Sequence, residues 1–343
     1  MPLLETAEVP VAFWPASRVV AQALVRNGCQ LATSYPGSPV VGVAEELRQL
    51  DEQGLVQFRY ATNEKIAFEM AAAAALGGQP AACVVKHVGL NVALDAVMGV
   101  AYTGVKAPLI LVVGDDPSCE SSSTEQDSRH LARFIGVPCI EPATVAEIPG
   151  AVKLASNVSS ETGSLVVVRV TDELAYSSAT LRLEHIETGP EATTPRPPYR
   201  EPEFVLLPAI SRANRPRAID RLERARAMGR APAFTSTERI GYTHRTNSIS
   251  THGKGVLSTE SASRGFVVAN AAYRAFERAV TRLGVQVDSW RTLMPWPLNV
   301  ERLVEFAARF DEIIVVEALD PILEEQAIAG VHRAGLHTRV RGS

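Results

Sequence analysis

Three short, continuous runs of apolar and β-branched residues most constrain the fold of this 343-residue chain. They are "AACVVKH" (81–87), "APLILVVGDD" (107–116) and "SLVVVRVTD" (164–172). Each run is too short for a typical helix and is bounded by polar or turn residues, which is the pattern of a strand. A strand with one solvated face alternates apolar and polar residues, whereas a continuously apolar strand is covered on both faces. The runs therefore predict a parallel sheet flanked by helices.

Helical segments alternate with these strands. The segments 15–28 and 63–78 carry apolar residues at helical spacing and end at glycines, which commonly terminate helices. The same alternation returns near the C-terminus, with strands expected at 264–270, 285–290 and 312–318 and helices at 271–284 and 299–310. We therefore expect an α/β fold with two open parallel-sheet domains.

The segment between the two domains has a different composition. Residues 187–204 are rich in Pro, Thr and charge, 215–230 predict a highly charged surface helix, and 236–255 predict a polar loop. The expected organisation is a first domain at 1–186, a linker with a surface helix at 187–254, and a smaller second domain at 255–343.

Composition excludes several classes of function. The net charge of −4 and the lack of a basic stretch argue against binding to nucleic acid or to an anionic membrane. The four cysteines are scattered without a CxxC pair, which argues against a zinc site or an iron–sulfur cluster on this chain and favours a reducing compartment. Without a signal-peptide pattern or an apolar run that could span a bilayer, we expect a cytoplasmic protein. Motifs for dinucleotides, P-loop nucleotides, serine hydrolysis and HExxH zinc sites are also missing.

Four polar loops stand where open α/β sheets place their ligands. The first is the Pro-Gly turn "TSYPGSP" (33–39), and such turns are common without function. In "TNEK" (62–65), Asn63 can cap the following helix and Glu64 favours its dipole, so local rules alone favour a capping role for Glu64. "KHVGLN" (86–91) places Lys86, His87 and Asn91 around a glycine directly after a strand. A lone histidine is usually structural, but the Lys-His pair at a strand end makes a structural and a functional role about equally supported. The last loop, 114–130, is either solvated or uses Arg129 to bind a carboxylate.

Taken together and in this order, the four loops resemble the α subunit of indolepyruvate:ferredoxin oxidoreductase, a thiamine-diphosphate enzyme. "YPGSP" is similar to the YPG-[TS]-P turn of that family, and "NEKIAFE" is similar to its NEKVALE helix. The resemblance continues through "KHVGLNVALDAVMGVAYTGVK" and "DDPSCESSSTEQDSR" and downstream through "VLLPAISR", "MPWPLNVERL" and "VVEALDPILEEQ". It implies a pyrimidine-binding domain followed by a transketolase C-terminal-like domain.

The resemblance also implies roles for individual residues. Glu64 stands where these enzymes place the glutamate that activates the cofactor, His87 would steer protons or bind the substrate, and Arg129 would bind the substrate carboxylate. Further residues would line the cofactor pocket: Tyr35, Pro36, Gly37, Ser38, Gly89 and Asn91. The sequence "GDD" (114–116) departs from the Gly-Asp-Gly…Asn motif that holds Mg²⁺ in this family, since no Asn follows before Asn157. We therefore expect no metal ligand on this chain.

The missing motif leads to an expected partner chain. A second subunit would carry the diphosphate-binding domain and the Mg²⁺ ligands, iron–sulfur clusters would lie only on a partner, and the assembly would be a heterotetramer or larger. The expected substrate is a 2-oxo acid, with an arylpyruvate as the family's suggestion and with coenzyme A and ferredoxin as further partners. One alternative is a subunit of a non-oxidative 2-oxo acid decarboxylase or carboligase, which a partner without cysteine clusters would favour. Another is a non-catalytic scaffold subunit, which would not bind the cofactor.

Overall fold

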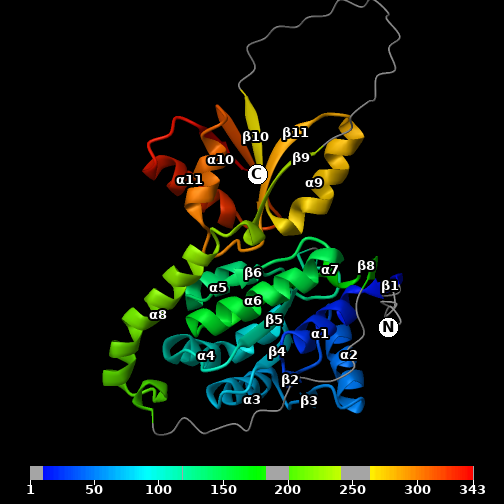
Figure 1. Ribbon diagram of the computed structural model, residues 1–343, viewed down its shortest axis with the longest axis vertical. Coiled ribbons are helices and arrows are strands. Elements are labelled where there is room, and N and C mark those ends of the chain that lie inside the picture. Colours follow the sequence, from blue (N-terminus) through cyan, green and yellow to red (C-terminus); the bar gives the residue numbers. More distant parts are fainter. Residues whose placement is uncertain (1–10, 118, 183–200, 241–262, 343) are drawn as a thin grey trace, which may run out of the picture. The chain divides into compact units, whose positions relative to one another are not determined.

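The chain divides into two compact units, Met1–Met228 and Gly229–Ser343, each built around its own sheet (Figure 1). The computed structural model describes residues 11–117, 119–182, 201–240 and 263–342. Among these residues, no helix combines the length and the apolar character that crossing a membrane requires.

The sheet of the first unit is parallel and has six strands in the order β3-β2-β4-β5-β7-β6 among the described residues. Its strands are β2 (Leu31–Ser34), β3 (Gln57–Tyr60), β4 (Ala81–Lys86), β5 (Leu109–Asp115), β6 (Cys139–Ile140) and β7 (Val166–Thr171). Every residue of β5 and β7 is buried, and so are the first five residues of β4. The three apolar runs therefore form central strands covered on both faces, which confirms the prediction of a helix-flanked parallel sheet.

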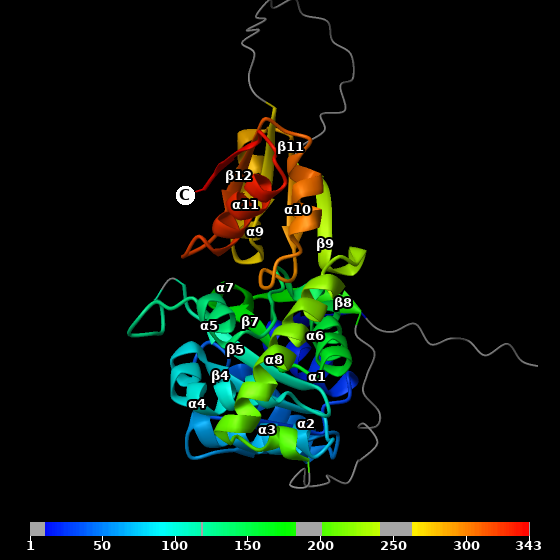
Figure 2. The same ribbon diagram turned by 90° about the vertical axis from the view of Figure 1, so that its left-hand side faces the viewer.

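Helices connect the strands of this sheet (Figure 2). Helix α1 packs against α2 and α6, and α3 packs against α4. The helices are α1 (Ala16–Arg26), α2 (Val41–Glu52), α3 (Glu64–Leu76), α4 (His87–Thr103), α5 (Ser128–Ile135), α6 (Ile148–Thr162) and the short α7 (Asp172–Ala175). A two-stranded antiparallel ribbon of β1 (Val11–Pro15) and β8 (Ser178–Arg182), which the sequence patterns did not predict, also belongs to this unit.

The predicted surface helix is present as α8 (Pro208–Met228), and it begins earlier than the charge pattern indicated. Helix α8 packs against α4 and α6, so it belongs to the first unit. The boundary between the two units lies between Met228 and Gly229, inside the predicted linker 187–254. The described residues of this linker before the boundary therefore belong to the first unit, and those after it belong to the second.

In its described ranges, 229–240 and 263–342, the second unit contains a five-stranded sheet in the order β13-β12-β10-β11-β9. Its elements are β9 (Thr235–Ile240), β10 (Arg264–Val268), α9 (Asn270–Leu283), β11 (Val287–Thr292), α10 (Val300–Ala307), β12 (Glu312–Val316), α11 (Ile322–Arg333) and β13 (Arg339–Arg341). All pairings are parallel except that of the edge strand β9, which runs antiparallel to β11. The predicted strands and helices after residue 264 are confirmed.

The prediction of a polar loop at 236–255 was wrong for its first part, which lies in β9. Polar residues are accepted in this strand because it lies at the sheet edge, where cross-strand ion pairs replace apolar packing. Glu238 pairs with Arg291 at 3.2 Å, and Arg239 pairs with Asp288 at 3.1 Å. The rest of the predicted loop, 241–255, lies outside the described residues.

Candidate functional site

The loops singled out in the sequence converge at the carboxyl ends of β2 and β4. Strand β3, which follows β2 in the chain, pairs with one edge of β2, and the next strand, β4, pairs with the other edge of β2. At such a reversal of strand order open α/β sheets bind ligands outside the strand ends, and we term this place, at the carboxyl ends of β2 and β4, the crevice. The turn "TSYPGSP" leaves β2, helix α3 begins with Glu64, and "KHVGLN" begins at the last residue of β4.

The structure shows that Asn63, and not Glu64, caps helix α3 through its side chain. The side chain of Asn63 accepts a hydrogen bond from the backbone N–H of Ile66 at 2.9 Å, so Asn63 is the N-cap of α3. In the part of the chain that the structure describes, neither a hydrogen bond nor an ion pair engages the Glu64 carboxylate. A half-buried carboxylate on the first turn of a rigid helix is thus left available for a ligand.

Two glycines let side chains approach each other closely at this crevice. A Cβ atom on Gly89 would lie 2.5 Å from Cγ and 2.7 Å from Oε1 of Glu64, so the glutamate rests directly against the first turn of α4. A Cβ atom on Gly37 would lie 2.9 Å from Cβ of Lys86, so the Pro-Gly turn rests on the lysine stem. The turn, the glutamate and the start of α4 therefore form one packed group.

The polar side chains of "KHVGLN" hold the loop that follows β5. Lys86 Nζ donates to the Ser121 carbonyl at 2.8 Å, and Asn91 Nδ2 donates to Gln126 Oε1 at 2.9 Å. His87 is fully buried, with Nδ1 at 3.3 Å from the Gly114 carbonyl and Nε2 at 3.2 Å from the Thr124 carbonyl. A neutral imidazole carries a single N–H, so it donates to one of these carbonyls at a time. In this arrangement His87 positions the loop.

Asp116 organises the same loop from inside. Its carboxylate accepts hydrogen bonds from the backbone N–H of Glu120 at 2.9 Å and of Ser121 at 2.8 Å, and from the hydroxyl of Ser122 at 2.6 Å. Burial alone would raise the pKa of Asp116, but these hydrogen bonds stabilise the ionised form and lower the pKa to about 2.

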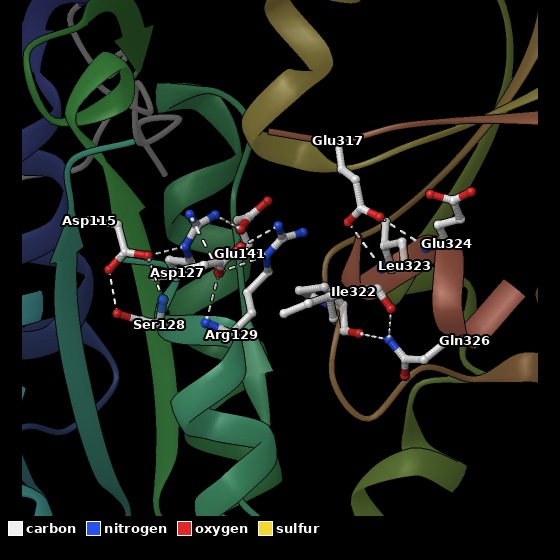
Figure 3. A network of polar contacts seen from close by, with 12 residues as sticks. Asp115, Asp127, Ser128, Arg129, Glu141, Glu317, Ile322, Leu323, Glu324 and Gln326 are labelled. Carbon is white, nitrogen blue, oxygen red and sulfur yellow. Dashed lines mark hydrogen bonds and ion pairs between the residues drawn. The ribbon is translucent and has the colours of Figure 1, made fainter. Parts of the chain in front are cut away.

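Arg129 lies apart from this group, in a buried network of charges at the ends of β5, β6 and β7 (Figure 3). Its Nε donates to both carboxylate oxygens of Asp127, at 2.9 and 3.0 Å. Arg169 contacts the carboxylates of Asp115 and Glu141. Burial opposes the charge on Asp127, but Arg169 and Arg129 outweigh it and lower the pKa of this carboxyl. The network fastens the start of α5 to the sheet.

The structure thus brings most predicted site residues together. Glu64, Gly37, Gly89 and the exposed Tyr35 lie around the crevice, with Pro36 and Ser38 in the Pro-Gly turn. The expectation that "KHVGLN" is a loop was wrong, because His87–Asn91 form the start of α4, and Asn91 lies on that helix. Arg129 has a relative exposure of 0%, and this burial favours a structural role over contact with a substrate. Lys86, which the sequence indicated as part of a Lys-His pair but to which it assigned no role, contacts both the Pro-Gly turn and the loop after β5.

Comparisons with known proteins show which proteins this chain is similar to. Residues 15–133 match the family model described as the thiamine pyrophosphate enzyme N-terminal TPP binding domain. The chain is 30% identical over 334 residues to the indolepyruvate oxidoreductase subunit IorA of Methanothermobacter marburgensis, and 30% identical over 342 residues to that of Pyrococcus abyssi. Each alignment covers 96% of the chain. The chain is thus similar to these IorA subunits along most of its own length.

The chain spans about half the length of the IorA relatives that it matches, 50% of the first and 49% of the second. Its fold is also similar to a solved 2-oxoglutarate:ferredoxin oxidoreductase from Magnetococcus marinus, with a TM-score of 0.70 over 97% of this chain and 62% of that one. At 13% sequence identity, this likeness concerns the fold alone.

Proposed function

We propose that the chain is one subunit of a thiamine-diphosphate-dependent 2-oxo acid:ferredoxin oxidoreductase, in which it supplies the pyrimidine-binding half of the active site. The observation that carries this proposal is the Glu64 carboxylate, which is mounted on α3, rests against Gly89 and has no hydrogen-bond partner among the described residues. The match of residues 15–133 to a thiamine pyrophosphate binding domain supports it.

The residues around the crevice fit this cofactor. The space that a Cβ atom on Gly89 would fill is taken by the Glu64 carboxyl group, which is thereby held at the crevice. In the proposed role, this carboxyl would hold the pyrimidine ring of the cofactor by a hydrogen bond to its ring nitrogen and would serve as the proton donor and acceptor there. Tyr35, Pro36, Gly37, Ser38, Gly89 and Asn91 would line the pocket. Thiamine diphosphate, when bound, supplies the nucleophilic carbon and the electron sink that decarboxylation of a 2-oxo acid needs.

The proposal includes a partner subunit. The word "subunit" in the names of the IorA relatives supports it. The partner would bind the diphosphate and Mg²⁺ and carry any iron–sulfur clusters, in a cytoplasmic heterotetramer or larger assembly. An arylpyruvate is the proposed substrate class, with coenzyme A and ferredoxin as acceptors. The names of the relatives favour this oxidative outcome over the non-oxidative alternative, and cysteine clusters in the co-purified partner would support it further.

The test is Glu64→Gln in the chain co-expressed with its partner. Turnover of a 2-oxo acid should fall about 10²- to 10⁴-fold, because amide nitrogen cannot replace the carboxyl in proton transfer. Assembly and folding should be unchanged. Glu69→Gln is the matched control, since Glu69 is an exposed residue of the same helix. Near-normal turnover in the Glu64→Gln complex would overturn the assignment.

A further inference from the structure

Lys86 stands out as a half-buried cation without a carboxylate partner. In the described ranges its ammonium group makes one hydrogen bond, to the Ser121 carbonyl, and no ion pair. Lys65 and Lys106, in contrast, pair with Asp95 and Glu201. An ammonium has three N–H donors, so two donors of Lys86 remain for a ligand. The hydrogen bond to Ser121 lies in an exposed environment, so an incoming ligand can reach the ammonium.

A lysine at the N-cap of α4 does not stabilise that helix. Lys86 is the N-cap residue of the 17-residue helix α4, and its side chain makes no capping hydrogen bond. A positive charge at this end opposes the helix macrodipole, which favours anions. The ammonium and the free N–H groups of the first turn would both attract an anion. Glu64 rests against the Gly89 side of the same turn, but no ion pair joins it to Lys86.

Packing fixes where the lysine stem lies. Gly37 leaves room for it, since an added Cβ there would lie 2.9 Å from Cβ and 3.6 Å from Cδ of Lys86. On the other side, the Ser121 carbonyl holds Nζ at 2.8 Å. The ammonium is thereby held between the Pro-Gly turn after β2 and the loop after β5, at the crevice that Glu64 borders.

We propose that Lys86 binds the carboxylate of the 2-oxo acid substrate, a role that the buried Arg129 is poorly placed to fill. This proposal rests on the proposed function, because it assigns the substrate contact of that same site. Lysine acts as a point charge on a flexible stem, so it can bind the carboxylate without fixing its orientation. Lys86 is then a determinant of specificity for 2-oxo acids over the corresponding aldehydes and amides.

The test measures preference for a carboxylate rather than turnover. The chain assembled with its partner is titrated with indole-3-lactate and phenyllactate, which keep the carboxylate but lack the keto group, and with the two matching amides. The wild-type complex should prefer each acid over its amide by about 10-fold or more, and Lys86→Met should reduce the preference to about 2-fold or less. Lys86→Arg should keep part of it. Lys153→Met, at an exposed lysine of α6, is the control and should match the wild type.

Turnover and cofactor binding give separate readouts. Lys86→Met should raise KM for the 2-oxo acid about 10-fold or more, with a smaller effect on kcat, and leave thiamine diphosphate affinity unchanged. An unchanged acid-over-amide preference in Lys86→Met, no such preference in the wild type, or a loss of thiamine diphosphate binding in Lys86→Met would each overturn the role of Lys86. Failure of the proposed function is distinguishable, because the wild-type complex would then neither bind thiamine diphosphate nor turn over a 2-oxo acid.

Discussion

At the level of single residues, two neighbours at the start of α3 divide two tasks between them. Asn63 caps the helix by accepting a hydrogen bond from the Ile66 N–H. The carboxylate of the adjacent Glu64 makes no hydrogen bond or ion pair within the described residues. The dipole of α3 still favours a carboxylate at this position by about 0.3–1 kcal/mol. Because Asn63 satisfies the backbone, a substitution of Glu64 can change the chemistry of the site without unfolding the helix.

Gly89 gives a prediction at this scale. In Gly89→Ala, the added methyl group would meet Cγ of Glu64 at 2.5 Å, so the glutamate must move. A displacement of about 1 Å at a reacting group can lower the rate about 100-fold, and we expect a loss of at least about 10-fold in turnover by the assembled enzyme. Turnover and thermal unfolding are measured together, since alanine is itself the better helix former.

Gly150→Ala is the matched control. Gly150 lies in α6, and a Cβ atom there would have no neighbour within 4 Å. This variant should keep full turnover and be equally or slightly more stable. If Gly89→Ala also kept full turnover, the carboxyl group of Glu64 would not depend on its contact with Gly89.

The sequence predicted the local features of this site and missed those that depend on distant residues. The cap at Asn63 and the start of α3 follow from residues 63–66 alone. The role of Lys86 depends on Gly37 and on Ser121, which are distant in sequence. The burial of Arg129 likewise depends on packing against β7, where the distant Arg169 pairs with Asp127 at 3.8 Å. The position of Arg129 in a polar loop therefore suggested an exposure that the folded chain does not have.

At the level of elements, α8 shows how a strongly polar helix can pack on a domain. Its arginines donate to the last carbonyl groups of two other helices, where cations also complement the helix dipole. Arg221 Nη2 donates to the carbonyls of Ala101 and Tyr102 at the end of α4, both at 2.9 Å, and Arg224 donates to Glu161 at the end of α6. The charge pattern predicted this helix, but it could not indicate that specific arginines fasten it.

Arg221→Ala tests this mode of attachment. It leaves two carbonyl groups without their donor and should destabilise the first unit by about 1–3 kcal/mol, because hydrogen bonds to charged groups contribute about that much. The measurement is chemical denaturation of the full chain, monitored with a spectroscopic probe located in the first unit. Arg212→Ala, an exposed position of the same helix, should change stability by no more than about 0.5 kcal/mol. Equal effects of the two variants would show that α8 is held by other contacts.

At the level of the whole molecule, the candidate site and the second sheet belong to different units. All of the residues assigned to the crevice lie in Met1–Met228, and Gly229–Ser343 has a separate core. The strands and helices of the second unit between residues 264 and 318 were predictable, since their apolar pattern is local, whereas α11 and β13 were not predicted. The antiparallel edge strand β9 was not, because its polar residues are stabilised only by pairing with β11.

Because the second unit has its own hydrophobic core, we expect residues 229–343 to fold without the rest of the chain. Leu303, Ile313 and Leu323 are fully buried within one cluster of that unit, and Trp290 packs in the same cluster. Glu317 caps α11 by accepting hydrogen bonds from the N–H groups of Leu323 at 3.0 Å and Glu324 at 2.9 Å (Figure 3).

The isolated fragment 229–343 should therefore unfold in one cooperative thermal transition, measured by circular dichroism. Leu303→Ala should lower its stability by about 2–5 kcal/mol, whereas Arg274→Ala on the exposed side of α9 should have little effect. A broad, non-cooperative transition, or equal effects of the two substitutions, would mean that the core of this unit forms only in the full chain.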